Sequence, residues 1–167
     1  GLTTAIVRFS NVYGDVRDHP DRVVPAFARA AALAPTTPGI VRVDGADCTF
    51  DFTFIDDVAD GLLRLINRLQ KGDADLPPIH FVTGEQTSLG ELAEHAIRHG
   101  GPNLRRIEAP RRDFDVSRFA GDPTNAERLL GWRAKTMIDA GFALLVAAYR
   151  DELVGRPIKA IAGQDRD

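Results

Sequence analysis

The densest group of side chains able to do chemistry is a run of arginines in the second half of the chain. The segment 98–118, the arginine window, contains more basic than acidic residues. Its basic residues are Arg98, Arg105, Arg106, Arg111, Arg112 and Arg118, and its acidic residues are Glu108, Asp113 and Asp115. A guanidinium group binds phosphate or carboxylate through paired hydrogen bonds. The window therefore predicts an anion-binding loop, and the alternative is a solvated surface loop with ordinary ion pairs.

A second candidate is the series Glu91, His95 and His99, which recurs every four residues. Two imidazoles at this spacing on one helix face can share a metal ion. The metalloprotease pattern places a glutamate directly after the first histidine, where this chain has Ala96. We expect an exposed polar helix face and no metal site.

The remaining polar candidates favour structural roles. Asp56 and Asp57 could form an acid and base pair, but they directly precede an apolar periodic segment, so we expect helix caps. Ser10, Ser88 and Ser117 lack the glycine-flanked turn that presents a hydrolase nucleophile. No catalytic residue is therefore expected among them.

Two apolar runs, Thr4–Phe9 and Ile79–Thr83, predict parallel strands covered on both faces. Two strong strands are too few to complete a parallel sheet, so we expect the missing strands to precede Gly1. The edge near Thr4–Phe9 would then pair with that preceding half or with another copy of the chain, which predicts a homo-oligomer as the alternative.

Helices are predicted between and after these strands by their capping residues and apolar spacing. The first covers 23–33, with Pro25 in its first turn, and the second ends near Gly72 with a buried stripe of Val58, Leu62, Leu65, Ile66 and Leu69. Ser88 and Glu91 have capping-box spacing and open a helix that ends at Gly100. A short helix follows Asp122-Pro123 and ends at Gly131, and a last amphipathic helix covers 136–153.

Composition restricts the partners and the compartment. The chain has 167 residues, of which 44% are hydrophobic and 27% charged, and this composition is typical of one globular domain. Its net charge of −3 provides no general positive field that would attract nucleic acid. No segment approaches the ~18 apolar residues of a membrane span. The lone Cys48 cannot form an internal disulfide, so we expect a reducing, cytoplasmic location.

Four segments occur in the order typical of one family. They are 8–14 (RFSNVYG), 52–61 (FTFIDDVADG), 110–112 with Asp115, and 129–132 (LLGW). Together they resemble the C-terminal half of the extended short-chain dehydrogenase/reductases, the NAD-dependent nucleotide-sugar epimerases and dehydratases.

The resemblance implies an α/β fold, namely the C-terminal part of a Rossmann-like doubly wound parallel sheet plus a small substrate-binding lobe. That part would cover 1–154, with a flexible tail at 155–167. NAD would be held mainly by a preceding half, with Phe9, Ser10 and Val12 bordering its nicotinamide.

The resemblance also assigns substrate contacts. Asn11 corresponds to an asparagine that hydrogen-bonds the substrate near its diphosphate, Arg112 to an arginine that holds the diphosphate, and Asp115 to an acidic residue on the ribose. The segment under the nucleotide corresponds to Arg22, Val23 and Pro25.

Two positions depart from the family pattern. Phe50 stands where the family usually has a second diphosphate-binding arginine, and Phe114 stands where it usually has a small residue. The loss of a cation and the gain of two aromatic rings permit a less charged or more apolar substrate.

The chain also lacks the family's reaction chemistry. It has no Gly-x-x-Gly-x-x-Gly turn for the cofactor phosphates, and no tyrosine is followed four residues later by lysine, because Arg17 follows Tyr13 and Leu153 follows Tyr149. We therefore expect a substrate-binding part that is inactive alone. The alternatives are a non-enzymatic nucleotide-sugar-binding module, an assembly module, or a related oxidoreductase acting on a less charged substrate.

Overall fold

The two apolar runs do pair as parallel strands. The computed structural model describes residues 3–111 and 116–155, so Arg112, Phe114, Asp115 and the expected tail from 156 lie outside the described residues. Strand β1 (Val7–Phe9) runs parallel to β6 (Ile79–Phe81), with Val7 opposite Ile79. The short regular parts lie within the longer ranges predicted.

The other strands form three further pairs. β2 (Asn11–Tyr13) runs parallel to β5 (Phe52–Phe54), and β3 (Gly39–Asp44) runs parallel to β8 (Leu104–Ala109). β4 (Thr49–Phe50) pairs antiparallel with β7 (Thr87–Ser88). Within the described chain, each sheet therefore has two strands, and β1 pairs only with β6.

The helices begin and end close to the predicted residues. They are α1 (Val23–Leu33), α2 (Ile55–Gln70), α3 (Leu89–Gly100), α4 (Thr124–Leu130) and α5 (Ile138–Gly155), with a 3-10 turn at Gly101–Asn103. The capping box of Ser88 and Glu91 is present, and Gly131 ends α4 in the left-handed conformation that glycine favours. No helix among the described residues is long and apolar enough to cross a membrane.

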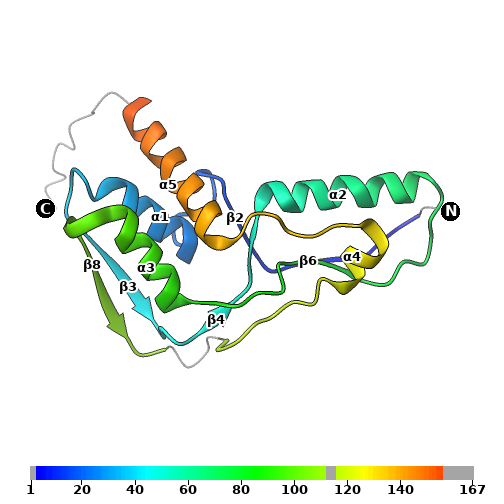
Figure 1. The fold of residues 1–167 in the computed structure, drawn as a ribbon, viewed down its shortest axis with the longest axis horizontal. Coiled ribbons are helices and arrows are strands. Elements are labelled where there is room, and N and C mark those ends of the chain that lie inside the picture. The colour runs from blue at the N-terminus through cyan, green and yellow to red at the C-terminus, as the bar shows by residue number, and fades with distance from the viewer. Residues whose placement is uncertain (1–2, 112–115, 156–167) are drawn as a thin grey trace, which may run out of the picture.

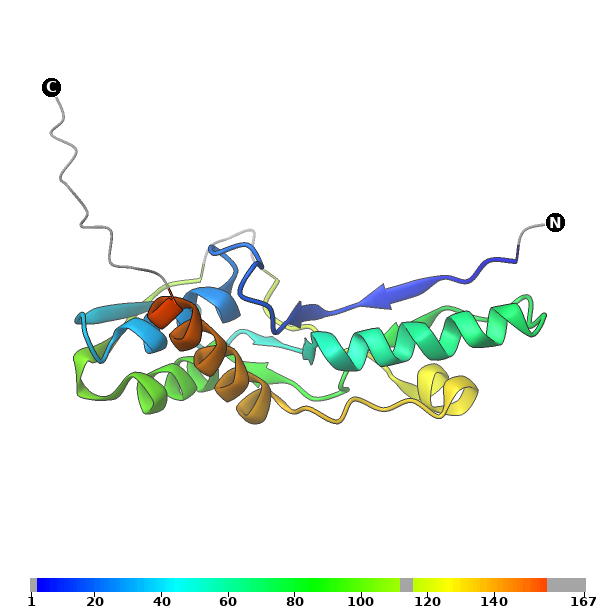
Figure 2. The ribbon, with the colours of Figure 1, turned by 90° about the horizontal axis from the view of Figure 1, so that it is seen from above.

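Two separate apolar cores stabilise opposite ends of the molecule. The first core joins α1, α3 and α5 to β3, β5 and β8, and the second joins α2, α4, β6 and Trp132. Figure 1 shows the corresponding helices gathered at the two ends of an elongated chain. Figure 2 shows β1 running alongside α2 at the second end. The short pairs β2–β5 and β4–β7 connect the ends.

The buried stripe of α2 is shifted from the prediction. Val58 and Leu65 are buried, but Ile66 is 47% exposed, so its assignment to the stripe is wrong. Gly61 is buried instead, because its bare backbone faces the Phe81 ring, which a Cβ atom at Gly61 would approach to 2.5 Å. The close approach of this ring turns the contact face of α2 toward Gly61 and away from Ile66.

The expected capping by Asp56 or Asp57 is also wrong. The residue at the N-cap of α2 is Phe54, which makes no side-chain cap bond. The Asp57 carboxylate accepts hydrogen bonds from the backbone N–H groups of Lys135 (3.0 Å) and Thr136 (2.8 Å). It therefore fastens the segment before α5 onto α2.

Candidate functional site

The predicted substrate residues meet where β2 and the N-terminus of α1 come together. Asn11 is the first residue of β2, and Arg22 precedes α1, whose first turn contains Val23 and Pro25. All four line one pocket of about 170 Å³, together with Tyr13, Val24 and Phe52. The structure thus brings Asn11 together with three residues that lie eleven or more positions later in the sequence.

A larger pocket of about 320 Å³ shares Asn11, Val23 and Phe52 with the smaller one. Its remaining lining is mixed in character and comprises Asp21, Ala26, Phe27, Arg42, Val43, Asp44, Cys48, Phe50 and Leu89. Phe50 and Phe52 make an aromatic wall, with ring centroids 6.3 Å apart. Together, the two pockets therefore present the Asn11 amide, the aromatic rings of Phe50 and Phe52 and several charged side chains to a ligand.

The three residues predicted to border the nicotinamide lie outside these pockets. Phe9 is 44% exposed on β1 and stacks on Phe81, with centroids 6.2 Å apart. The Ser10 hydroxyl lies 2.9 Å from the Thr53 hydroxyl and donates to the Asp51 carboxylate at 3.3 Å. Val12 lines an adjoining hollow with Gly14 and Ile55, which shares Tyr13 and Arg22 with the smaller pocket.

The fully buried Asp51 anchors the segment between the pocket residues Phe50 and Phe52. Its carboxylate accepts hydrogen bonds from the backbone N–H groups of Thr83 (3.0 Å) and Gly84 (2.8 Å) and from the Thr83 hydroxyl (2.9 Å). Its backbone carbonyl accepts from the Asn11 N–H at 3.2 Å. Asp51 therefore ties the loop after β6 to the strand that presents Asn11.

The role of Asp51 is not among the predictions from the sequence, although the sequence carries a signal for it. An acidic residue stands there within the apolar and aromatic run Phe50–Ile55. A carboxylate that cannot reach water in such a run requires several donors, which marks a structural anchor.

The phenol of Tyr13 is held in its neutral form. The residue is 2% exposed, and its hydroxyl has no hydrogen-bond partner among the described residues. Burial raises the pKa of Tyr13 above its ordinary value, and the carboxylates of Asp57 and Asp139 act in the same direction. Tyr13 is therefore poorly suited to exchange a proton near neutral pH.

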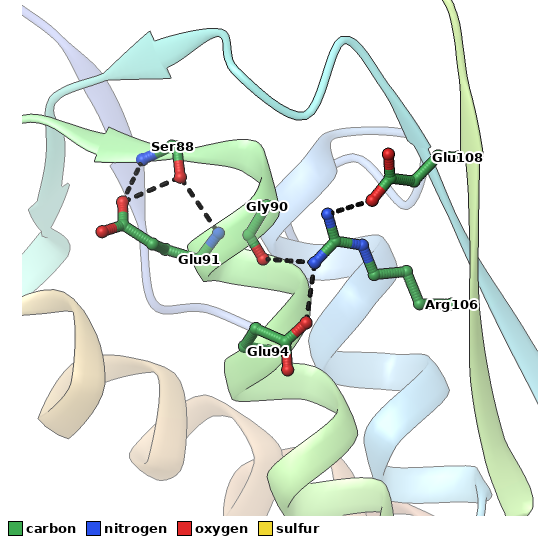
Figure 3. Close-up of polar contacts among 6 residues, drawn as sticks. All are labelled: Ser88, Gly90, Glu91, Glu94, Arg106 and Glu108. Carbon is green, nitrogen blue, oxygen red and sulfur yellow. Dashed lines mark hydrogen bonds and ion pairs between the residues drawn. The ribbon is translucent and has the colours of Figure 1, made fainter.

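One member of the arginine window, Arg106, is engaged inside the protein. The Arg106 guanidinium donates to Glu94 (2.7 Å), Glu108 (2.5 Å) and the Gly90 carbonyl, as Figure 3 shows beside the Ser88–Glu91 capping box. Its charge is neutralised within the protein. The exposed members of the window that the structure describes are Arg98, Arg105, Arg111 and Arg118.

The histidines of α3 are packed rather than fully exposed. His95 and His99 lie beside Phe142 of α5, with ring centroids 6.1 and 5.9 Å apart, so the expectation of an exposed face is wrong for both imidazoles. Burial lowers the pKa of each below its ordinary value. Among the described residues, no group of His, Cys, Asp and Glu is arranged to hold a metal ion.

Comparison with known proteins gives a consistent family. Residues 1–84 match the NAD dependent epimerase/dehydratase family. UDP-glucuronic acid decarboxylase 4 of Arabidopsis thaliana is 34% identical over 90% of this chain and 32% of that protein. UDP-glucose 4-epimerase of Mycolicibacterium smegmatis is 33% identical over 86% of this chain and 44% of that protein.

Solved structures with a similar fold indicate the same family as the related sequences. UDP-glucose 4-epimerase of Thermotoga maritima, with UDP-glucose, superposes with a TM-score of 0.74 at 26% identity, covering 89% of this chain and 46% of that chain. UDP-glucose-4-epimerase of Stenotrophomonas maltophila gives a TM-score of 0.79 at 22% identity over 92% and 49%. The α/β fold expected of a Rossmann-like enzyme is thus confirmed, and the chain spans from a third to about half the length of these relatives.

Proposed function

The chain belongs to the NAD dependent epimerase/dehydratase family, and from that premise we propose that it is the nucleotide-sugar-binding part of such an enzyme. The observation that carries the proposal is the meeting of Asn11, Arg22, Val23 and Pro25 around one pocket. The relatives named for UDP-glucose, UDP-glucuronic acid and dTDP-L-rhamnose support a sugar joined to a nucleoside diphosphate as the ligand class.

Most of the residues of the site have a defined task in this proposal. The Asn11 amide donates to the substrate near its diphosphate, and Val23 and Pro25 give apolar surface under the nucleotide. Arg112 and Asp115, which lie outside the described residues, contact the diphosphate and the ribose. Phe27, Phe50 and Phe52 exclude water from one side of the ligand.

The residues present would border the cofactor without holding it. NAD would take a hydride from a sugar carbon and return it. Phe9 offers an exposed ring at the unpaired edge of β1, but the Ser10 hydroxyl is engaged with Asp51 and Thr53. Neither supplies the phosphate-binding backbone that a dinucleotide requires.

We further propose that this chain alone performs no turnover. Tyr13 is buried with a raised pKa, and burial also raises the pKa of Tyr149, so neither phenol fits the role of general base. Incubation with NAD and a panel of nucleotide-sugars should give neither NADH absorbance nor epimerised product. Conversion by the purified chain would contradict this part of the proposal.

Titration calorimetry with UDP-glucose tests the binding function. Asn11→Ala should weaken binding about tenfold, because a hydrogen bond to a charged or polar ligand contributes roughly 1.5 kcal/mol. The matched control is Asn67→Ala, an exposed asparagine on α2 that lines neither pocket. Absence of binding by the unchanged protein would overturn the proposal.

A second candidate ligand is a less charged substrate of the same oxidoreductase class. It is favoured by Phe50, which places a ring in the pocket wall where the family usually has an arginine. Preference for a neutral sugar or aglycone over UDP-glucose in the same titration would support this candidate.

The remaining parts of the proposal concern assembly and location. β1 pairs only with β6 in the described chain, so its other edge is open to a further strand, and the apolar side chains of Ile6 and Phe9 are exposed nearby. This supports pairing with an N-terminal half or a second copy, which sedimentation at high concentration tests.

The buried, unpaired Cys48 supports a reducing cytoplasmic location.

A further inference from the structure

We propose that Arg42 is a second phosphate-binding cation for this ligand and takes over the task of the arginine that Phe50 replaces. The inference rests on the proposed nucleotide-sugar function and adds a residue to it. Arg42 and Phe50 line the same 320 Å³ pocket, which also contains Asn11 and Val23. Arg42 on β3 and Phe50 on β4 would therefore contact the same bound ligand.

The strand pattern explains why Arg42 is available there. Val41 and Val43 are buried in the first core, so the alternation of β3 places Arg42 on its open face with 66% of its side chain exposed. The side chain reaches the pocket from a strand whose backbone is fixed by six residue pairs with β8. The backbone of Arg42 is therefore held rigidly, and its side chain is accessible to a ligand.

The contacts of Arg42 leave most of its donors for a ligand. Its Nε–H donates to Asp44 Oδ1 at 2.8 Å, and both residues line the pocket. Within residues 3–111 and 116–155, neither of its terminal nitrogens donates to a protein acceptor. These two amino groups present the fork that matches a phosphate.

The neighbouring arginines are less suitable for this task. Arg22 gives Nη1 to both carboxylate oxygens of Asp18, at 3.1 and 3.0 Å. Arg106 is held by Glu94 and Glu108 and lines neither pocket. Arg42 is therefore the arginine of the larger pocket's described lining that can meet an anion.

Two carboxylates limit the strength of this site. Asp44 and the exposed Asp21 also line the pocket, so the field at Arg42 is partly cancelled. Binding of an anion here should weaken with salt, because exposed charges are screened. Asp21→Asn should tighten the binding of UDP, since it removes a repelling charge.

Titration calorimetry with UDP at two salt concentrations tests the assignment. Arg42→Gln should weaken UDP about tenfold to a hundredfold at low salt, the range typical of a charge-assisted contact. It should also reduce the salt dependence of the remaining binding. The control is Arg105→Gln, which removes an exposed arginine from β8 on the paired strand but outside the pocket, and should change neither quantity.

The outcomes separate this inference from the proposed function. If UDP binds the unchanged protein and Arg42→Gln equally well, the assignment of Arg42 is overturned while the proposed function stands. If Arg42→Gln weakens UDP and leaves the salt dependence unchanged, the effect is structural and the assignment is again overturned. If the unchanged protein does not bind UDP or UDP-glucose, both fail together. Circular dichroism of each variant verifies that it is folded.

Discussion

The indole Nε1–H of Trp132 donates a 2.8 Å hydrogen bond to the backbone carbonyl of Asp57, 75 residues earlier in the chain. The same ring meets Phe81 edge-on, with centroids 5.0 Å apart. Trp132 therefore joins the segment after α4 to both α2 and β6. Its side chain is buried in the second core, with an exposure of 1%.

Replacing Asp57 by asparagine should destabilise the protein. The buried carboxylate accepts from two backbone N–H groups, and the neutral amide offers them a weaker acceptor. We expect the free energy of unfolding to fall by about 1–3 kcal/mol in urea denaturation. The exposed neighbour supplies the control, because Asp56→Asn should stay within about 0.5 kcal/mol of the unchanged protein.

Gly61→Ala should overpack the second core. The added methyl group would lie 2.5 Å from the Phe81 ring and 3.0 Å from the Trp132 indole nitrogen, and both residues are buried. The cost of about 1–3 kcal/mol exceeds the gain of about 1 kcal/mol in helix propensity. Gly155→Ala meets no atom within 4 Å and should not lower the melting temperature. A stabilised Gly61→Ala protein would show that α2 can move away from β6.

Asp51→Asn should loosen the segment that carries the pocket residues Phe50 and Phe52. The variant keeps the size of the side chain but turns one acceptor into a donor that faces the N–H groups of Thr83 and Gly84. Hydrogen exchange at these two amides should accelerate, and the free energy of unfolding should fall by roughly 2–3 kcal/mol. Asp47→Asn, at an exposed position on the approach to the same strand, should leave both unchanged.

Stability should depend on pH through the imidazoles beside Phe142. Burial is the main cause that lowers the pKa of His95 and His99, with Arg98 acting on both and Arg150 on His99, while Asp139 and Glu91 oppose the shift of His95. Because the folded pKa values lie below the ordinary 6.5, the unfolded chain binds more protons in that range.

The stabilising contribution of these histidines is therefore complete above about pH 6.5 and is lost as the pH falls toward the folded pKa values. Denaturation in urea from pH 8 to 5.5 should show this loss. The double variant His95→Gln with His99→Gln should flatten the curve, and His19→Gln, which is exposed, should not. An unchanged slope in the double variant would refute the assignment.

Local signals in the sequence predicted the helix ends well. The bounds of α1 match the prediction, and the capping box at Ser88 and the glycine at 131 fix where α3 begins and α4 ends. These features depend on residues three or four positions apart, so their chemistry is visible without the fold.

Features that depend on distant partners could not be predicted in this way. The role of Asp57 requires the backbone of Lys135 and Thr136, and the exposure of Ile66 follows from the approach of Phe81 to Gly61. The packing of His95 and His99 depends on Phe142 in another helix. In the candidate site, the resemblance gave Asn11 and the start of α1, whereas Arg42 is recognised only because the fold brings it and Phe50 into the lining of one pocket.

The division into two cores has a thermodynamic consequence for ligand recognition. Val23, Phe27, Val43 and Phe52 belong both to the larger pocket and to the first core or its partly buried margin, whereas that pocket's lining takes no residue from the core of α2, α4 and β6. A bound nucleotide-sugar would lower the free energy of one end of the molecule only. Calorimetric melting should then resolve into two transitions, of which the ligand moves one upward in temperature and leaves the other in place.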